Sequence, residues 1–569
     1  MSKSQKITAL IAALLYTVAA FCFFRFLYPY HIHYQESFQL FEFSGAYFGS
    51  VASVPGGFAD YLGRFMTQFF YFANAGAILT ALLLLAVQLL TYAASRSRSL
   101  TAFMLGFIPS ACLWISYCDE NALAGPAIAI CIALALSMIV TGIKCSRGKL
   151  IAGLIGVPVS YMLCGPLAIV FVYFAFKDQE FWKLATGTAL LALLPLVGQY
   201  LFAYPASRLY TGIHYYRYHN VFPGWTWIAA ACTVIIALVP RFCKCSKPSR
   251  FAGPAIFVLT AAALFVGLRA KADFVKEDIM KYDFKVEHRM WNRIISDARK
   301  KNPSSPLSVA ALNMALTKTD NMSGHMFDFY QNGPQGLLPS FVRESTTAMA
   351  LSNLYYHLGM VNTAQRTAFE ACESIPDYQK SASCYQMLVR TNIINGDYEV
   401  AAKYIATLKN TLFYRGWAKQ AEKLLYNEDG IANSPEYYDM RARRISSKDF
   451  LFSENEMVSM LGQMFMENKE NSNALDYLLA WSLLDKDLEM FKQCLSLVSY
   501  PVLPELYQEA LALEWVASGQ NGTFPAYVDR GVAEKFSKFM NDREKGKADS
   551  YMAMGYASTY WFYYFYRFK

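Results

Sequence analysis

Long apolar runs alternate with short polar segments over the first 270 residues of the chain. Most of the runs are close to the roughly 20 residues that a helix needs to cross the hydrocarbon core of a bilayer. Eight runs are present, at residues 7–28, 69–94, 101–117, 121–143, 150–176, 181–203, 223–240 and 252–269. This pattern predicts a polytopic transmembrane helical domain of about eight to ten spans over residues 1–270.

The run 150–176 contains residues that interrupt a helix, namely Gly156, Pro158 and the tripeptide Cys164-Gly165-Pro166. Proline removes a backbone donor and clashes with the preceding turn, so a broken helix at membrane depth has to be packed inside the protein. We predict that this run forms two short helices that turn back as a hairpin.

Basic residues gather in the polar segments that the hairpin places on one side of the membrane. By the positive-inside rule this side is cytoplasmic. The basic residues are Lys3, Lys6, Arg96, Arg98, Lys144, Arg147, Lys149, Arg241, Lys244, Lys247 and Arg250. The sequence therefore predicts a multi-pass protein of the inner (plasma) membrane. Its outer side would carry the segments 29–68, 118–121 and 204–222 and the chain after residue 269.

From residue 271 the pattern changes to amphipathic helices with short Gly, Asn or Pro breaks. One stretch has small, aromatic, glycine, alanine and proline residues at the positions of a tetratricopeptide helix pair, whose period is 34. These residues are Ser352, Tyr355, Gly359, Ala364, Ala368, Ala371 and Pro376, and Gly396, Tyr398 and Ala401 begin a degenerate second copy. We predict an all-α chain in which a soluble, extracytoplasmic TPR-like solenoid occupies residues 271–569.

The C-terminal tail, residues 551–568, is very rich in Tyr and Phe. Such rings favour the membrane–water interface, so the tail could lie on the bilayer. They are equally suited to a terminal solenoid helix buried against its neighbour, and the sequence leaves both interpretations open.

Composition supports the membrane interpretation, since 55% of the residues are hydrophobic and only 17% are charged. The net positive charge comes from the apolar half, where 18 Lys and Arg stand against seven Asp and Glu; the rest of the chain has 34 against 36. That balance is a topology signal, so we expect no nucleic-acid partner.

Two of these seven acids, Asp119 and Glu120, are adjacent in the predicted outer turn 118–121, and Glu36 follows the first span. Charged side chains near membrane depth are costly, which marks this pair as a candidate site. The three carboxylates could bind a divalent cation, Mg²⁺ or Mn²⁺, or one could act as a general base toward a hydroxyl. Alternatively, the acids cap helices or pair with Arg64 and Arg208.

The predicted outer loop 204–222 combines basic and aromatic side chains. Arg can bind phosphate bidentately and Tyr packs against sugar rings, so this loop suits a lipid headgroup that carries a ring. The same residues are also ordinary interfacial anchors. The candidates are Arg208, Arg217, His214, His219 and Tyr216, with Arg25 near the outer end of the first span.

An acid after the first span, an acid pair in a later outer turn, broken helices and an outer C-terminal domain together resemble the GT-C superfamily of polyprenyl-phosphate-dependent glycosyltransferases and oligosaccharyltransferases. The resemblance covers residues 1–270 and implies transfer of a sugar or glycan from a polyprenyl-phosphate carrier to an outer-face acceptor. Glu36, Asp119 and Glu120 would then position the metal and the acceptor. Arg208 or Arg217 would hold the lipid phosphate, and the solenoid would hold the acceptor protein or glycan.

A membrane-anchored TPR scaffold for protein–protein interaction in envelope assembly, without catalysis, is the alternative. A tether needs only one span, whereas this chain has many. The transferase hypothesis expects the three carboxylates to converge, and the scaffold hypothesis does not require it. A transporter is disfavoured because the predicted span interiors contain almost no ionisable residues.

Overall fold

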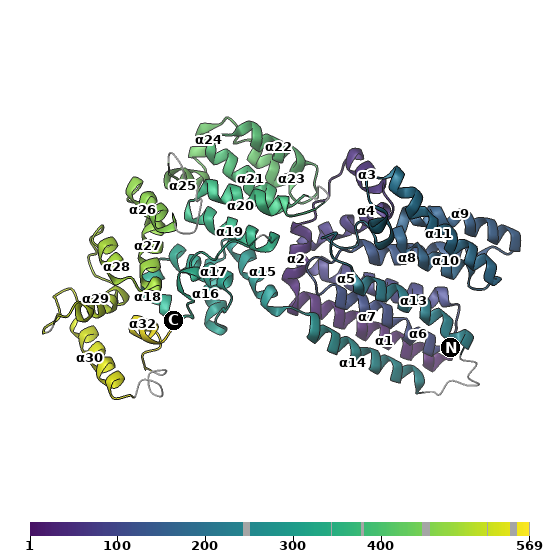
Figure 1. The fold of residues 1–569 in the computed structure, drawn as a ribbon, viewed down its shortest axis with the longest axis horizontal. Helices are drawn as coiled ribbons and strands as arrows, with labels where there is room; N and C mark the ends of the chain where they lie inside the picture. The colour runs from purple at the N-terminus through teal and green to yellow at the C-terminus, as the bar shows by residue number, and fades with distance from the viewer. Residues whose placement is uncertain are drawn as a thin grey trace. The chain divides into compact units, whose positions relative to one another are not determined.

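The computed structural model describes residues 1–242, 251–342, 344–376, 380–445, 456–520, 522–546 and 555–567 (Figure 1). Within these ranges the regular structure is helical throughout, and the one extended pairing is an isolated bridge between Ala122 and Tyr216. The all-α prediction is confirmed.

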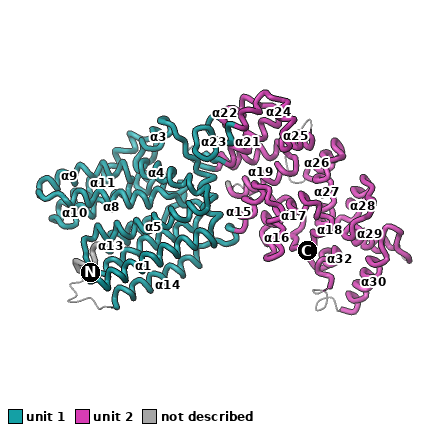
Figure 2. Tube along the Cα trace, turned by 180° about the vertical axis from the view of Figure 1, so that it is seen from behind, with its two compact units in different colours: residues 1–277, 375–382, 406–419 teal, residues 278–374, 383–405, 420–569 magenta. Residues whose placement is uncertain are grey.

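The chain forms two compact units (Figure 2). The first unit comprises residues 1–277 together with 375–382 and 406–419, and the second comprises residues 278–374, 383–405 and 420–569. The two short later segments of the first unit had no counterpart in the sequence analysis, because nothing in their composition distinguishes them from their neighbours.

Six helical stretches of the first unit are long and apolar enough to span a bilayer, which makes this a membrane-associated protein. They are Lys3–Leu27, Ala73–Ser95, Gly125–Gly142, Ser146–Phe176, Phe181–Leu201 and Ala252–Lys271. Two more predicted runs form shorter apolar helices, Leu100–Ser116 and Gly224–Ile236. Many Leu, Ile, Val and Phe side chains of the apolar helices are exposed, which suits a surface in contact with lipid rather than water.

The predicted hairpin is present in the run 150–176. Helix α9 (Ser146–Cys164) ends at Gly165, which adopts a positive φ of 62°, and α10 (Ala168–Phe176) runs back beside it. Two glycines of α9 make room for α10, since a Cβ at Gly153 would meet the ring of Phe176 and one at Gly156 the ring of Phe171. These pairings run in opposite directions along the two helices, so the chain reverses at Gly165.

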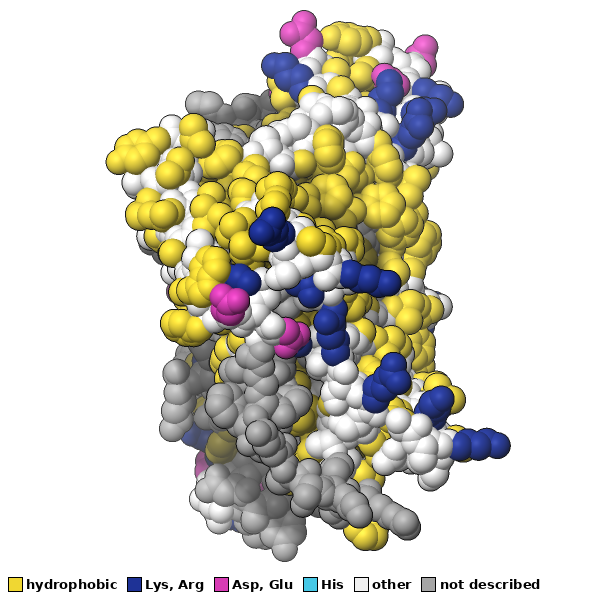
Figure 3. Space-filling model, turned by 90° about the vertical axis from the view of Figure 1, so that its right-hand side faces the viewer, with side chains coloured by type: hydrophobic (Ala, Val, Ile, Leu, Met, Phe, Trp, Pro, Cys, Tyr) yellow, Lys and Arg dark blue, Asp and Glu magenta, His cyan; other side chains and the backbone are white. Residues whose placement is uncertain are grey.

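One end of the first unit gathers the basic segments. The Met1 amino group donates to Arg98 O (3.1 Å), Arg96 to Thr141 O (2.6 Å) and Lys177 to Ala94 O (2.9 Å). Figure 3 looks at the molecule from the side where the N-terminus lies and shows more Lys and Arg than acidic side chains on a largely hydrophobic surface. The predicted basic residues 244, 247 and 250 lie outside the described residues.

The opposite end carries short helices between α1 (Lys3–Cys22) and α5 (Ala73–Ser95). These are α2 (Pro29–Ser37), α3 (Gly45–Ala52) and α4 (Gly57–Thr67). The two later segments of the first unit fix the chain after α2, since Leu40 N–H donates to Lys380 O (3.0 Å) and Phe43 N–H to Asn410 O (2.7 Å). Lys380 also pairs with Glu42 (2.6 Å).

The second unit is a series of helices, many of them arranged as antiparallel pairs. In order they are α15 (Phe274–Glu287, which starts in the first unit), α16 (Trp291–Lys300), α17 (Pro306–Lys318), α18 (Met322–His325), α19 (Ser345–Leu358), α20 (Val361–Glu373), α21 (Ala382–Asn395), α22 (Tyr398–Lys409, which ends in the first unit), α23 (Arg415–Glu422, which starts in the first unit), α24 (Glu428–Ala432), α25 (Pro435–Arg443), α26 (Met457–Glu467), α27 (Ser472–Asp485), α28 (Leu488–Leu495), α29 (Glu505–Ala517), α30 (Arg530–Glu544) and α32 (Tyr560–Tyr566).

The predicted repeat glycines lie between paired helices. Gly359 (φ 102°) separates α19 from α20 and Gly396 (φ 87°) separates α21 from α22, both in the left-handed conformation that glycine adopts without strain. Ala364 is fully buried, and its carbonyl accepts from Ser352 Oγ (2.7 Å) across the first pair. The helix pairs are therefore present, and their assignment to the tetratricopeptide class stays a prediction.

The described part of the aromatic tail is packed against the second unit's own helices. Tyr560, Trp561 and Tyr563 of α32 are buried, and the Trp561 ring lies 5.0 Å from that of Phe536. Glu509 of α29 accepts from Tyr560 N–H (2.8 Å), and its own carbonyl accepts from Trp561 Nε1 (2.8 Å). This arrangement is the buried terminal helix, one of the two interpretations left open by the sequence; residues 551–554 and 568 lie outside the described residues.

Burial of Glu509 makes the stability of the second unit depend on pH. Desolvation raises the pKa of Glu509 to about 7 despite the Tyr560 hydrogen bond. A carboxyl whose folded pKa exceeds its unfolded value contributes stability that is fully present below the unfolded pKa and is lost as pH rises through the folded one. We expect Glu509→Gln to be more stable than the wild type at pH 8, by up to about 3 kcal/mol, and to gain nothing at pH 4.

Thermal unfolding of the detergent-solubilised chain between pH 4 and pH 8 measures this difference. Glu534→Gln on α30 is the matched control, because Glu534 is exposed and pairs with the exposed Arg530. Equal pH dependence of Glu509→Gln and the wild type would contradict the assignment.

Candidate functional site

The Asp119–Glu120 pair lies in the turn between α7 (Phe107–Ser116) and α8 (Gly125–Gly142), at the end opposite the basic segments. Three contacts fix this turn. Tyr28 Oη donates to Cys118 O (3.0 Å), Arg217 N–H donates to Asn121 O (3.0 Å), and the bridge of Ala122 with Tyr216 continues the same pairing. The loop 204–222 and the first span therefore hold the acids in place.

Asp119 is bound on both carboxylate oxygens. Oδ1 accepts from Asn121 N–H (2.9 Å), an Asx turn typical of Asp at such positions, and Oδ2 accepts from Tyr216 Oη (2.7 Å). Desolvation and then the negative charge of Glu120 raise the pKa of Asp119, and these effects outweigh the two hydrogen bonds that lower it. A carboxylate held in this way is suited to accept a proton from a hydroxyl.

Glu120 is 4% exposed and forms an ion pair with a lysine from a distant segment. Its Oε1 lies 2.5 Å from Lys276 Nζ and accepts from Asn121 Nδ2 (3.1 Å). Lys276 comes from the first turn of α15, which is capped by Asp273, whose Oδ1 accepts from Lys276 N–H (2.9 Å). The local Asp cap therefore places the lysine over the acid.

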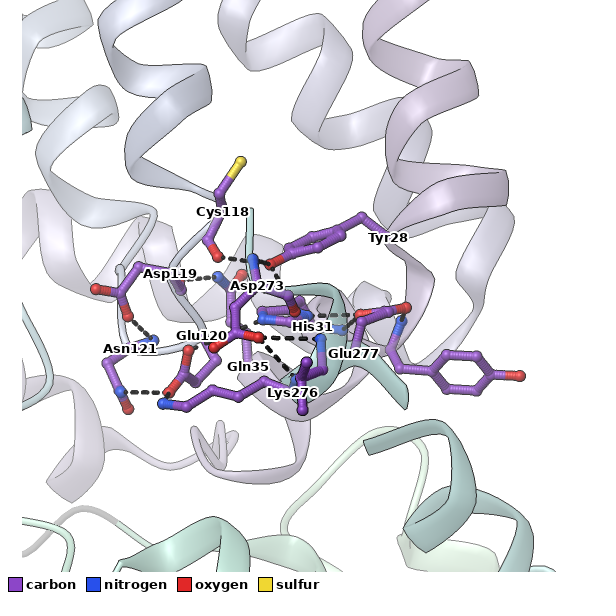
Figure 4. A network of polar contacts seen from close by, with 12 residues as sticks. Tyr28, His31, Gln35, Cys118, Asp119, Glu120, Asn121, Asp273, Lys276 and Glu277 are labelled. Carbon is purple, nitrogen blue, oxygen red and sulfur yellow. Dashed lines mark hydrogen bonds and ion pairs between the residues drawn. The ribbon is translucent and has the colours of Figure 1, made fainter. Parts of the chain in front are cut away.

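A fully buried histidine links this pair to a third carboxylate (Figure 4). His31 Nδ1 lies 2.5 Å from Glu277 Oε2, its Nε2 faces Glu120 Oε2 at 3.9 Å, and its ring stacks on Tyr28. Within the described residues Nε2 has no hydrogen-bond partner. The His31 ring thus lies between Glu277 and Glu120: its Nδ1 contacts Glu277, and its Nε2 faces Glu120 without a hydrogen bond.

Glu277 also caps α2. Its two oxygens accept from Tyr30 N–H (2.8 Å) and His31 N–H (3.0 Å), which lie in the first turn that Pro29 begins, where backbone donors have no carbonyl partner within the helix. A carboxylate at a helix N-terminus is favourable for both the donors and the helix dipole. Lys276 and Glu277 were not among the predicted site residues, because both fall in the predicted soluble domain; the one local signal was their position directly after the last apolar run.

A pocket of about 410 Å³ opens beside Asp119 and Glu120. Its polar walls carry both acids, Tyr216, Asn121 and two lysines. The lining residues are Ile115, Ser116, Cys118, Asp119, Glu120, Asn121, Tyr216, Val221, Phe222, Pro223, Gly224, Trp225, Lys271, Asp273 and Lys276.

An apolar groove of about 600 Å³ reaches the same helix ends. It is lined by Leu15, Tyr16, Ala19, Cys22, Phe23, Phe26, Leu27, Phe107, Trp114, Phe257, Thr260, Ala261, Leu264, Phe265 and Leu268, from α1 and the π-helical turn that follows it, α7, and α14 (Ala252–Lys271). Trp114 of the groove adjoins Ile115 of the pocket, and Leu268 lies one helical turn before Lys271. The groove and the pocket are therefore neighbours along two helices.

The structure separates Glu36 from the acid pair. Tyr414 Oη lies 2.8 and 2.7 Å from the two oxygens of Glu36, which is buried and does not line the pocket. The neighbouring Gln35 does reach the turn, through Asp119 O (3.3 Å). Glu36 therefore anchors α2 to the segment 406–419, and the convergence of Glu36 with Asp119 and Glu120 that the transferase hypothesis expects is not observed.

Of the five candidate binding residues in the loop 204–222, only Tyr216 lines the pocket. Arg217 is 1% exposed and donates to Phe38 O (3.0 Å), with Nε and Nη2 unpartnered among the described atoms. Arg208 donates to Ile213 O (3.0 Å), and His214 packs edge-on against Tyr204. His219 is exposed and Arg25 donates to Asn74 Oδ1, and neither side chain lines the pocket.

The alternative pairing of the two adjacent acids with Arg64 or Arg208 is not observed among the described residues. Arg64 binds Asp60 within α4 (2.7 Å), and the cation on Glu120 is Lys276. Over the described ranges, no three His, Cys, Asp or Glu side chains are grouped to hold a metal ion. Lys276 contacts Glu120 and Tyr414 contacts Glu36 in this arrangement. The Mg²⁺ or Mn²⁺ expectation stays a prediction.

The apolar helices, the adjoining groove and the buried acid–lysine–histidine network define a helical membrane protein with a polar pocket at one end of its helices. A family model described as "Family of unknown function (DUF6057)" matches residues 3–567, so the chain belongs to this family. Neither a curated protein nor a solved structure matches the chain.

Proposed function

We propose that the protein is a GT-C-like transferase that moves a sugar or glycan from a polyprenyl-phosphate carrier to an acceptor on the outer face of the plasma membrane. The observation that carries the proposal is the apolar groove that adjoins the polar pocket of Asp119 and Glu120. A lipid-linked sugar needs both surfaces side by side, one for the isoprenoid chain and one for the headgroup.

In this proposal the isoprenoid chain lies in the groove and the phosphate reaches the pocket. Lys271 and Lys276 line the pocket, in place of the arginines expected there; Lys271 supplies positive charge for the phosphate, and Lys276, which is paired with Glu120, supplies further N–H donors. The acceptor hydroxyl attacks the anomeric carbon and Asp119 accepts its proton. The bond from the anomeric carbon to the phosphate oxygen breaks, and the lysines stabilise the leaving phosphate.

The basic end of the first unit supports an outer location of the pocket. Positive residues favour the cytoplasm, and the pocket lies at the opposite helix ends. We place the second unit on the same outer side, where its helices would hold the acceptor protein or glycan.

The test blocks the groove and leaves the fold intact. We expect Ala261→Trp to fill the groove, so that cells lose a glycan and accumulate its polyprenyl-linked precursor, as a deletion strain does. Ala262→Trp is the matched control, because Ala262 is an exposed neighbour on α14 that does not line the groove.

Mass spectrometry of glycans and of extracted polyprenyl-linked sugars gives both readouts. Unchanged glycans and carriers in the deletion strain would overturn the proposal. If residues 271–569 alone then rescued another phenotype of that strain, the scaffold hypothesis would replace it.

A further inference from the structure

A second polar pocket, of about 410 Å³, lies wholly within the second unit. Four helices or helix ends far apart in sequence build it: the start of α16, the last residue of α17, the last turn of α19, and α25. Its lining residues are Arg289, Trp291, Lys318, His357, Pro435, Glu436, Asp439, Met440 and Arg443. Its volume falls in the range of small-molecule sites.

Two of its three cations are already paired with carboxylates. Arg289 Nη2 lies 2.7 Å from Glu436 Oε1, and Arg443 Nε lies 2.7 Å from Asp439 Oδ1. Both acids keep oxygens that can accept further hydrogen bonds. The paired arginines therefore leave little charge for a ligand, and they present acceptors as well as donors.

Lys318 is the third cation, and it forms no ion pair within the described residues. It contacts a neutral group, since the amide oxygen of Asn473, when turned toward it, accepts from Nζ (2.7 Å). Burial and then the nearby Arg443 charge lower the pKa of Lys318 to about 7, and the Asp439 carboxylate only partly offsets them. A buried ammonium without an ion-pair partner is costly, and an anion bound beside it would reduce that cost.

Trp291 gives the pocket an aromatic wall. Its ring is half-buried and packs edge-on against His357, with ring centroids 5.0 Å apart at 88°. Desolvation and the neighbouring cations lower the pKa of His357, so this ring stays neutral near pH 7. Arg289 adopts a left-handed φ of 54°, a conformation that costs a non-glycine residue of order 1 kcal/mol and is enriched at functional sites.

The combination selects among anionic ligands. A phosphate monoester carries close to two charges and is usually held by several unpaired cations. This pocket offers one lysine without an ion-pair partner among the described residues, two carboxylates that can accept from hydroxyls, and an indole face. A neutral sugar would leave Lys318 unmatched, whereas a monoanionic, hydroxyl-bearing ring matches all three features.

We propose that the pocket formed by Lys318, Trp291, Glu436 and Asp439 binds a carboxylated sugar of the uronic acid class. The carboxylate pairs with Lys318 and the ring lies along the indole. The hydroxyls donate to Glu436 and Asp439. This site is additional to the proposed transfer site, and direct binding tests it whether or not transfer occurs.

The experiment measures binding of D-glucuronate, D-glucose and glucose 6-phosphate to the purified full-length chain in detergent, by calorimetry and saturation-transfer NMR. We expect glucuronate to bind at least tenfold more tightly than either of the other two. Lys318→Met should weaken glucuronate binding at least tenfold, and Trp291→Ala should also weaken it. The control Lys538→Met removes an exposed lysine of α30 and should change nothing.

Lys318→Met removes a buried unpaired charge, so its melting temperature should equal or exceed that of the wild type, which separates lost binding from lost folding. Trp291→Ala supplies the decisive comparison if the methionine variant fails to fold. Absence of glucuronate binding, equal binding by Lys318→Met and the wild type, or tighter binding of glucose 6-phosphate than of glucuronate would each overturn the proposal.

Discussion

Replacing Glu277 with Ala is expected to destabilise the first unit by about 3 kcal/mol or more, because it removes the acceptor of three donors and each unsatisfied buried donor costs roughly 1–3 kcal/mol. Glu277 accepts from two backbone donors at the start of α2 and from His31 Nδ1 (2.5 Å). Alanine would leave the two buried His31 groups and the part-buried Tyr30 N–H without that acceptor.

Hydrogen exchange of the detergent-solubilised chain measures this effect locally. Peptides that cover α2 should exchange faster in Glu277→Ala, whereas peptides from α27 and α29 should not change. Glu277→Gln retains one side-chain oxygen and should fall between the wild type and the alanine variant.

The neighbouring substitution Asp278→Ala is the matched control, because among the described residues Asp278 pairs with the side chains of Lys281 and Lys301, which are partly or largely exposed. Unaltered protection of α2 in Glu277→Ala would show that the cap does not hold this helix.

Much of the architecture followed from local patterns in the sequence. Apolar runs of span length became helices, and Gly165 reversed the chain where a glycine next to a proline interrupts an apolar run. Gly359 and Gly396 each lie between the two helices of a pair, where the chain requires a positive φ. The run 101–117 was predicted as a single span, but it became α6 (Leu100–Leu105) and α7, which meet at Gly106.

The candidate site could be found only in part from the sequence. Asp119 and Glu120 were detectable because acids are scarce in the apolar half. Their partners were not, since Lys276 and Glu120 are 156 positions apart and Tyr414 and Glu36 are 378 apart. No periodicity relates such residues, and tertiary folding alone decides that lysines rather than the loop arginines reach the pocket.

Replacing Asp119 with Asn is expected to lower sugar transfer by 10²–10⁴-fold, the usual contribution of a general base. The fold should persist, because the asparagine oxygen can still accept from Asn121 N–H and its amide can donate to the Tyr216 oxygen. Initial rates with the lipid-linked sugar that accumulates in the deletion strain measure this loss, and Glu180→Gln, at an exposed acid outside the pocket, is the control.

The pH dependence of the transfer rate distinguishes a general base from a carboxylate with a purely structural role. Asp119 must be ionised to accept a proton, so the rate should rise with pH through its pKa, which burial and Glu120 hold above the ordinary value. Tyr216→Phe removes a hydrogen bond that stabilises the ionised form. This variant should therefore raise the pKa further and shift the acid limb of the pH–rate profile to higher pH, with a loss of rate smaller than that of Asp119→Asn. An Asp119→Asn variant that kept the wild-type rate would show that Asp119 is not the base, and so would a Tyr216→Phe profile without that shift. Either result would leave lipid binding in the groove to be tested by the Ala261→Trp experiment.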